Sequence, residues 1–244
     1  MLTKMLTLSA LALSSLALGQ AVKGAELDVT SGGKAYKSYL AAPASATPKA
    51  AVILLHSFNG LEQGYKDLVD EMAAAGYVTL ALGWQTFEKG PSDATVKALV
   101  EDGLKTLAAR GDVNMNAVGL TGFCAGGRYT MLLLPQMKAF KSGVAWYGFP
   151  DSGGTATQPR PPTDFIGDLT APMLILHGTR DQPSPVAGIY AYAQKLDAAN
   201  KNFKLTVYQG APHGFLLKEG KIADTSDSRD ARREMLDYFG DTLK

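Results

Sequence analysis

Three side chains capable of acid–base or nucleophilic chemistry follow short apolar runs of the sequence. Cys124 is the centre of a pentapeptide, 122–126, that reads G-F-C-A-G and comes directly after an apolar stretch. Asp181 follows the apolar run M-L-I-L-H-G-T-R, and His213 lies in the segment G-A-P-H-G-F. In nucleophilic catalysis a thiolate attacks, an imidazole carries the proton, and a carboxylate orients the imidazole. These three side chains are therefore the candidate catalytic residues.

The two glycines around Cys124 are typical of a sharp turn between a strand and a helix, known as a nucleophile elbow. Glycine at both positions lets neighbouring backbone approach without a Cβ clash, and the positive end of the following helix favours a thiolate. The alternative is an inert cysteine buried near a glycine-rich turn. The chain order Cys124, Asp181, His213, each after a predicted strand, is that of the α/β-hydrolase fold and favours the nucleophile. The backbone amides of Phe58 and Ala125 are the expected oxyanion donors.

The elements that must position these residues follow from alternating apolar and amphipathic segments, which predict an α/β protein. We expect an α/β-hydrolase fold with a mostly parallel central sheet, helices on both faces and an N-terminal antiparallel hairpin made of 26–30 and 34–41. The segment 149–168 is rich in Pro, Gly and Thr, which predicts a long loop, either a lid or a passive surface excursion. The further expected strands are 51–55, 77–82, 116–121, 142–146, 173–176 and 203–208, and the expected helices cover about 61–72, 92–107, 185–199 and 228–243.

The first 21 residues have the layout of a secretory signal peptide. Lys4 precedes an apolar run at 6–18, and small residues follow at Gly19 and Ala21. This pattern predicts cleavage, export to the periplasm or the medium, and one mature domain at 22–244. An uncleaved membrane anchor is the alternative, but it needs about 18–20 apolar residues.

Composition narrows the classes of partner. The chain has 244 residues, 24 basic against 23 acidic side chains and a formal net charge of +1, with no basic cluster that would indicate nucleic-acid binding. A single cysteine forms no internal disulfide, so in an exported protein its thiol is either buried or kept for reactivity. His56 and His177 each end a predicted strand and are expected to be structural hydrogen-bonding residues. No spacing of metal ligands is present, and we expect no cofactor, no metal and a monomer.

Four motifs resemble the dienelactone hydrolase family: G-F-C-A-G-G-R at 122–128, the acid loop at Asp181, P-H-G-F at 212–215 and W-Y-G at 146–148. The likeness runs from about residue 26 to the C-terminus. It implies a compact, cofactor-free hydrolase of the carboxymethylenebutenolidase type. The implied triad is Cys-His-Asp, and it would cleave lactones or activated esters through an acyl-thioester.

The chain departs from the best-known members of that family at three positions. Those members carry a glutamate at the position of Ser57, and arginines that hold a substrate carboxylate at the positions matching Gln85 and Leu217. Without the glutamate, Cys124 would be activated mainly by His213 and the helix terminus. Without the arginines, the chain lacks the charge-assisted contact that would hold such a carboxylate.

The identity of the substrate is open at this point. Hydrolysis of a carboxylic ester or lactone is the leading hypothesis. A second keeps the chemistry in a thioesterase or an acyltransferase of the same fold, and a third is a non-catalytic, redox-responsive protein in which Cys124 is a sensor thiol. Arg128, four residues after the cysteine, is expected to tie its helix to a neighbouring loop. The side chains expected to line a substrate pocket are Ser57, Phe58, Trp84, Phe123, Trp146, Tyr147 and Phe215.

Overall fold

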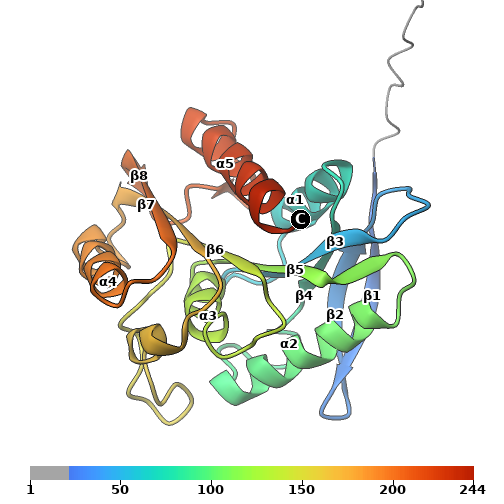
Figure 1. Cartoon of the computed structure of the whole chain (residues 1–244), viewed down its shortest axis with the longest axis horizontal. Helices are drawn as coiled ribbons and strands as arrows, with labels where there is room; N and C mark the ends of the chain where they lie inside the picture. Colours follow the sequence, from blue (N-terminus) through green and yellow to red (C-terminus); the bar gives the residue numbers. More distant parts are fainter. Residues whose placement is uncertain (1–21) are drawn as a thin grey trace, which may run out of the picture.

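A computed structural model of the chain describes residues 22–244, so the predicted leader at 1–21 lies outside the described residues. Within this range strands and helices alternate along nearly the whole chain (Figure 1). The strands are β1 (Ala25–Ser31), β2 (Lys34–Ala41), β3 (Lys49–Leu55), β4 (Val78–Leu82), β5 (Val113–Phe123), β6 (Ser142–Trp146), β7 (Met173–Arg180), β8 (Phe203–Pro212), β9 (Leu217–Lys218) and β10 (Lys221–Ile222). The helices are α1 (Gln63–Ala74), α2 (Asp93–Ala108), α3 (Ala125–Leu133), the 3-10 helix η1 (Pro162–Asp168), α4 (Val186–Ala198) and α5 (Ser226–Thr242).

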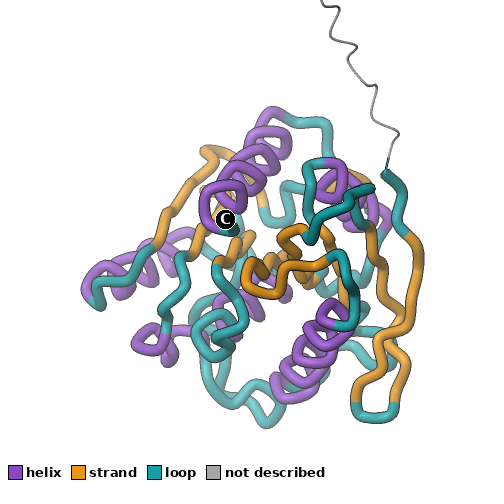
Figure 2. The backbone as a smooth tube through the Cα atoms, turned by 45° about the vertical axis from the view of Figure 1, so that its right-hand side comes forward, coloured by secondary structure: helices purple, strands orange, loops and turns teal. Residues whose placement is uncertain are grey.

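Eight of the strands form one sheet in the order β1-β2-β4-β3-β5-β6-β7-β8. From β4 to β8 all neighbours are parallel, whereas β2 is antiparallel to both β1 and β4. Figure 2 shows the long β1–β2 hairpin at one edge of the molecule. The mostly parallel sheet with its N-terminal antiparallel hairpin confirms the α/β-hydrolase fold expected from the sequence.

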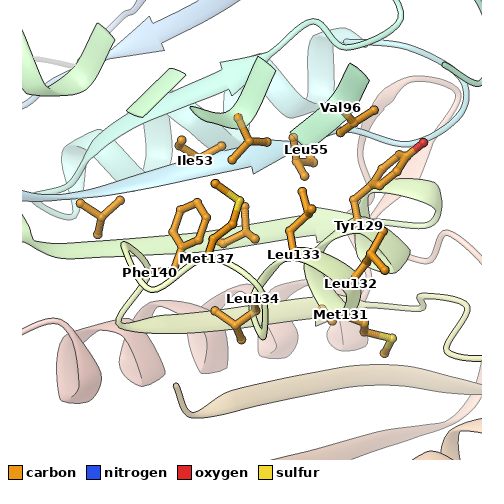
Figure 3. Packing of buried hydrophobic residues seen from close by; sticks show 14 of the residues in the cluster. Ile53, Leu55, Val96, Tyr129, Met131, Leu132, Leu133, Leu134, Met137 and Phe140 are labelled. Atoms are coloured by element: carbon orange, nitrogen blue, oxygen red, sulfur yellow. The ribbon is translucent and has the colours of Figure 1, made fainter. Parts of the chain in front are cut away.

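Helices cover both faces of the sheet because alternate residues of each central strand point to opposite sides. In β3, Ile53 and Leu55 belong to the apolar cluster shared with α2, α3 and α4, whereas Val52 and Leu54 belong to the cluster shared with α1 and α5. Figure 1 shows α1 and α5 on one side of the sheet and α2 and α3 on the other. Figure 3 shows Ile53 and Leu55 packed near Leu133 of α3. Each such side chain contributes about 1.5–3 kcal/mol on burial, so the central strands are firmly held between two layers.

Two helices begin at hydroxyl caps. The Ser92 hydroxyl accepts a hydrogen bond from the amide of Thr95 at 3.1 Å, so α2 begins where the sequence predicts. The Thr225 hydroxyl accepts one from the amide of Ser228 at 3.2 Å, so α5 begins two residues before the predicted start at 228.

Two elements differ from the expectations. The segment 149–168 was predicted to be a loop throughout, but 162–168 forms η1, in which Pro162 begins the helix and Ile166 is buried. A small hairpin, β9–β10, was not predicted because its strands are only two residues long, too short to show alternation. Its turn at Glu219 and Gly220 has φ values of 52° and 74°, the left-handed backbone of a tight hairpin turn.

Candidate active site

Cys124 lies on a strained turn that joins the end of β5 to the start of α3. Its φ of 57° and ψ of −115° are uncommon for a residue with a side chain and mark stored backbone strain. The surrounding backbone holds this conformation. The amide of Cys124 donates to the carbonyl of Trp146 at 3.1 Å, and its carbonyl accepts from the amide of Arg128 at 3.0 Å. The turn is therefore fixed from both sides.

The two glycines of the G-x-C-x-G motif are required by close backbone contacts. A Cβ at Gly122 would lie 2.1 Å from the carbonyl oxygen of Gly126, and a Cβ at Gly126 would lie 2.0 Å from the carbonyl oxygen of Leu55. Real Cβ atoms do not approach backbone oxygens so closely. The same contacts bring the first turn of α3 against the end of β3, where the loop carrying Phe58 begins.

The other two candidate residues lie side by side because β7 and β8 pair from Met173 and Phe203 onward, and a register shift after Gly178 realigns their ends. The last paired residues are Arg180 and Pro212, so the chain enters Asp181 and His213 from adjacent positions. Nδ1 of His213 lies 2.8 Å from Oδ2 of Asp181. The Asp181 side chain is fully buried, and its Oδ1 accepts a hydrogen bond from the amide of Ser184 at 2.8 Å. The carboxylate thus fixes the imidazole with its Nε2 free.

His213 is also influenced electrostatically by Cys124. Burial lowers the pKa of His213, but the hydrogen bond with Asp181 and the interactions with Cys124 outweigh burial and raise the pKa to about 9. At neutral pH the site thus favours an imidazolium next to the sulfur. A cysteine, a histidine and a carboxylate, each following directly after its strand, are brought together at the carboxyl edge of the sheet.

The remaining two histidines take part in structural hydrogen bonds, as expected. His56 is buried with its Nδ1 2.7 Å from the carbonyl of Ser57, and burial lowers its pKa to about 4. His177 is buried with its Nε2 2.8 Å from the carbonyl of Ser184 and 3.5 Å from Asp181, and burial lowers its pKa. Neither lines the cavity at Cys124. His177 instead packs against the acid loop and supports the position of its carboxylate.

Two backbone amides are available to a developing oxyanion. Ala125 is the first residue of α3, so its N–H has no acceptor within the helix. The N–H of Phe58 makes no hydrogen bond within residues 22–244. The loop carrying Phe58 is tightened by a hydrogen bond from the amide of Asn59 to the Ser57 hydroxyl at 3.2 Å. Both amides belong to segments that meet at the same edge of the sheet.

A cavity of about 350 Å³ opens at Cys124. Three of its lining side chains, Ser57, Phe58 and Tyr147, were expected from the sequence. Besides Cys124 and His213, seven further lining residues were not expected there. Tyr65 was assigned to the core face of a helix, Asn59 and Gly214 adjoin Phe58 and His213, and the others lie at the start of α1 or on the unpredicted β9–β10 hairpin. The glycine-containing turn K-E-G-K was the only signal for that hairpin. The full lining is Ser57, Phe58, Asn59, Glu62, Tyr65, Cys124, Tyr147, His213, Gly214, Leu217, Glu219 and Gly220.

Four aromatic side chains expected in the pocket pack in the core instead: Trp84, Phe123, Trp146 and Phe215. Trp84 stacks on His56 with ring centroids 5.0 Å apart and donates from Nε1 to the carbonyl of His56 at 3.1 Å. The other three surround one another beneath α1 and α5. They lie at or near strand ends, as predicted, but their side chains point into the layer between sheet and helices.

Two buried tyrosines, Tyr65 and Tyr147, line the cavity. Burial raises the pKa of Tyr147, and Tyr65 and Cys124 raise it further. Burial also raises the pKa of Tyr65, with smaller contributions from Glu62 and Cys124. Both phenols therefore stay protonated and can donate hydrogen bonds.

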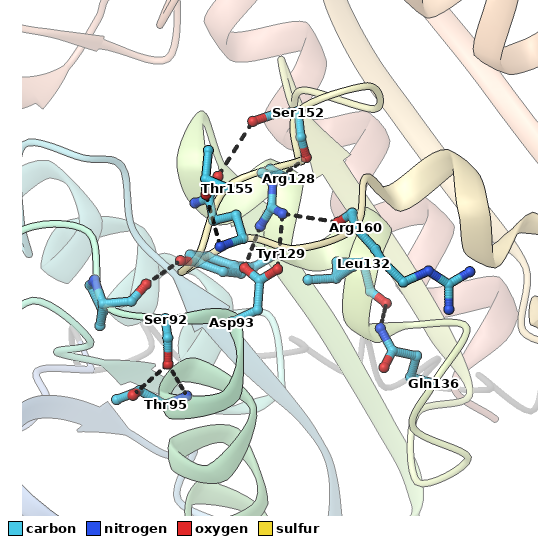
Figure 4. A network of polar contacts seen from close by, with 12 residues as sticks. Ser92, Asp93, Thr95, Arg128, Tyr129, Leu132, Gln136, Ser152, Thr155 and Arg160 are labelled. Carbon is cyan, nitrogen blue, oxygen red and sulfur yellow. Dashed lines mark hydrogen bonds and ion pairs between the residues drawn. The ribbon is translucent and has the colours of Figure 1, made fainter.

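Arg128 anchors α3 to the rest of the protein, as expected. Its Nη1 and Nη2 lie 2.7 and 3.0 Å from the two carboxylate oxygens of Asp93, and its Nε donates to the carbonyl of Ser152 at 3.0 Å (Figure 4). The amide of Asp93 in turn donates to the carbonyl of Thr157 at 2.9 Å. The segment 149–168 is thus held against α2 and α3, and none of its residues lines the cavity. This arrangement favours the passive surface excursion over the lid.

Two kinds of feature, a metal site and a membrane-spanning helix, are absent from the described part of the chain. Residues 22–244 contain no group of three or more His, Cys, Asp or Glu side chains placed to hold a metal ion. No helix in that same range is long and apolar enough to cross a membrane.

Comparison with known families places the chain among the hydrolases. A model of the dienelactone hydrolase family matches residues 36–243. The chain belongs to the dienelactone hydrolase family. It is similar to a candidate carboxymethylenebutenolidase of Methylorubrum extorquens, with 30% identity over 220 residues, covering 83% of this chain and 75% of the relative. A second candidate carboxymethylenebutenolidase, from Escherichia coli K12, is 28% identical over 228 residues, covering 86% of this chain and 84% of its own.

A solved structure supports the same assignment. The crystal structure of a candidate dienelactone hydrolase from Klebsiella pneumoniae superimposes with a TM-score of 0.82 and 27% identity, covering 91% of this chain and 99% of that protein. The fold also recurs in an acylaminoacyl peptidase of Pyrococcus horikoshii, with a TM-score of 0.78 and 14% identity, covering 92% of this chain and 42% of that one. This dienelactone hydrolase family member is therefore a hydrolase built on the α/β-hydrolase fold.

Proposed function

We propose that the chain hydrolyses carboxylic esters or lactones with Cys124 as the nucleophile, His213 as the acid–base group and Asp181 as the residue that orients His213. The observation that carries this proposal is the position of His213. Its Nδ1 lies 2.8 Å from the fully buried Asp181, and His213 lines the same cavity as Cys124 on its strained turn. A sensor thiol needs neither the oriented imidazole nor the glycine-framed turn, so the geometry favours a hydrolase over a redox-responsive protein.

The first half of the reaction forms an acyl-enzyme. The thiolate of Cys124 adds to the ester carbonyl, and the amides of Phe58 and Ala125 donate hydrogen bonds to the oxyanion. The tetrahedral intermediate collapses with cleavage of the carbon–oxygen bond. The imidazolium of His213 gives its proton to the leaving alkoxide, which departs as an alcohol. An acyl-thioester on Cys124 is left, together with a neutral imidazole.

The second half regenerates the enzyme. Neutral His213 takes a proton from a water molecule as the water adds to the thioester carbonyl, and the same two amides stabilise the second oxyanion. Collapse of this intermediate breaks the carbon–sulfur bond, which releases the carboxylic acid and restores the thiolate–imidazolium pair. Asp181 stabilises the imidazolium throughout and keeps Nε2 toward the reacting atoms.

Turnover of model substrates tests the proposal. The chain from residue 22, kept reduced, is assayed with p-nitrophenyl esters, small lactones and thioesters beside Cys124→Ala and beside iodoacetamide-treated enzyme. We expect turnover that disappears in both controls. Folded protein with an alkylatable thiol and no turnover on any of these substrates would contradict the proposal, and transfer of the acyl group to an added alcohol in preference to water would indicate an acyltransferase.

We also propose that the chain is exported, because 1–21 reads as a signal peptide. N-terminal sequencing of protein recovered from the periplasm and medium of a bacterial expression host tests this. A new N-terminus close to residue 20 or 22 is expected, and full-length protein retained in the cytoplasm would contradict it.

A further inference from the structure

The cavity at Cys124 has an acidic rim. Glu62, just before α1, and Glu219, at the β9–β10 turn, both line it, and no Lys or Arg does. Neither carboxylate forms an ion pair with any residue of the described range. Their charges are therefore available to whatever occupies the cavity.

The rim is held in place by the backbone. The amide of Gly64 in α1 donates to the carbonyl of Gly220 at 2.8 Å, which docks the hairpin turn onto the start of the helix. A Cβ at Gly220 would lie 3.2 Å from a carboxylate oxygen of Glu62, so the two acidic side chains lie at one side of the opening. Glu219 occupies a left-handed turn position and is solvent-exposed. Glu62 is half-buried.

Apart from His213, no side chain that can carry a positive charge lines the cavity beside this rim. A positive charge on His213 is offset by the buried carboxylate of Asp181, 2.8 Å from its Nδ1. The lysines on the β9–β10 strands, Lys218 and Lys221, are exposed and do not line the cavity.

The inner wall of the cavity carries an unused hydrogen-bond donor. Tyr147 lines the cavity and is 1% exposed. Its hydroxyl has no hydrogen-bond partner within the described residues. A buried polar group without a partner is destabilising, so this hydroxyl is suited to a bound ligand with an acceptor oxygen.

We propose that this site prefers esters bearing a cationic ammonium group, accepts uncharged esters less well, and discriminates against esters with a free carboxylate, with Glu62 and Glu219 as the specificity-determining residues. The inference rests on the proposed hydrolase function and adds the charge class of its substrate. Clefts lined by charge of one sign concentrate counter-ions and repel like charges, with effects on association of tenfold or more at low salt.

The test compares three acetate esters of similar size, detecting released acetate by proton NMR. Acetylcholine is the cation, 3,3-dimethylbutyl acetate is its uncharged carbon analogue, and 3-acetoxypropionate is the anion. We expect kcat/KM to fall in that order at low ionic strength, by at least about tenfold from cation to anion. The ratio should shrink at 0.5 M salt because screening shortens the Debye length to a few ångströms.

Variants assign the effect to the rim. In the Glu62→Gln, Glu219→Gln double variant the cation-to-anion ratio should fall at least about threefold, and each single variant should give an intermediate value. Ratios are taken within one enzyme, so a general change in activity cancels. The control is Glu101→Gln, which removes one charge, as each single variant does, from an exposed residue of α2. It should leave the ratio unchanged.

Three outcomes overturn the inference: an anionic ester turned over as fast as the cationic one, a ratio that salt does not alter, or a ratio unchanged in a folded double variant. Should the double variant not fold, the wild-type ratio and its salt dependence decide. An enzyme that hydrolyses p-nitrophenyl acetate but not acetylcholine also overturns the inference. Failure of the proposed function is a different result, namely no turnover of the p-nitrophenyl esters, lactones and thioesters either, or turnover that survives Cys124→Ala.

Discussion

Replacing Asp181 by Asn keeps the size of the side chain and removes the charge that His213 contacts. In the wild type the pKa of His213 is raised to about 9 from an ordinary value of 6.5, although burial lowers it. This difference corresponds to about 3 kcal/mol in favour of the imidazolium, shared between Asp181 and Cys124. Assigning half to the carboxylate predicts a loss of more than about tenfold in kcat/KM from charge alone, at about 1.4 kcal/mol per factor of ten.

The orientation of the imidazole adds to that loss. One oxygen of Asp181 accepts the amide of Ser184 at 2.8 Å, and in Asp181→Asn the carboxamide oxygen keeps that bond. The NH₂ group then faces Nδ1 of His213, so Nδ1 becomes the acceptor and Nε2 carries the proton on the neutral ring. An imidazole in that tautomer does not accept a proton from water, and a comparable substitution in a serine protease costs about 10⁴ in kcat. We therefore expect a total loss of about 100- to 10 000-fold.

The assay is kcat/KM on a p-nitrophenyl ester between pH 5 and 10, beside thermal unfolding to show that the variant is folded. Asp168→Asn, an equivalent change at an exposed residue of η1, serves as the control and should leave both quantities unaltered. A folded Asp181→Asn enzyme that retains more than about a third of wild-type kcat/KM would refute the assigned role of the carboxylate.

Three further predictions concern stability. Because the folded pKa of His213 lies above its unfolded value, its contribution is complete below about pH 6.5 and lost as pH rises through about 9. The free energy of unfolding relative to His213→Gln should therefore fall by about 3 kcal/mol across that window, measured by urea titration at pH 6 and pH 10. Gly126→Ala should cost more than about 3 kcal/mol or prevent folding, because the new Cβ would overlap a β3 carbonyl, whereas Gly111→Ala has open space and should be tolerated, as judged by melting temperature. Arg128→Met should cost about 3–5 kcal/mol in denaturant unfolding because it strands the carboxylate of Asp93, and a cost under about 1 kcal/mol would show that the pair is not anchoring α3.

The sheet and the three candidate catalytic residues were predictable from the sequence for the same physical reason. Central strands of a parallel sheet are buried on both faces, so β3, β4 and β6 read as short continuous apolar runs with clear ends. Cys124 and Asp181 come after largely buried strands, whereas His213 follows the edge strand β8, which has a mixed burial pattern. Parallel strands deliver the residues that follow them to one edge. The glycines at 122 and 126 report a close backbone approach that only glycine permits.

The pocket was less predictable because it depends on side-chain direction and on short elements. Phe123 and Trp146 are the last residues of the neighbouring strands β5 and β6, and Tyr147 follows Trp146 directly. Of these three aromatic residues only Tyr147, whose φ is 36°, lines the cavity. Helical periodicity assigned Tyr65 to a core face, which is correct, but Tyr65 also lines the cavity. The hairpin bearing Glu219 has two-residue strands, and it is held on α1 by a backbone hydrogen bond from Gly64 to Gly220 and by close packing against Gly64.

The central claim is that the acyl group passes through the sulfur of Cys124, and a rapid acid quench tests it most directly. The enzyme is mixed with a p-nitrophenyl ester, quenched during turnover, and measured as intact protein and as peptides by mass spectrometry. We predict a mass increase of one acyl group on the peptide containing Cys124, which hydroxylamine removes and which forms and decays fast enough to account for kcat. Turnover with no acylation of Cys124, or with the acyl group on another residue, would contradict the mechanism.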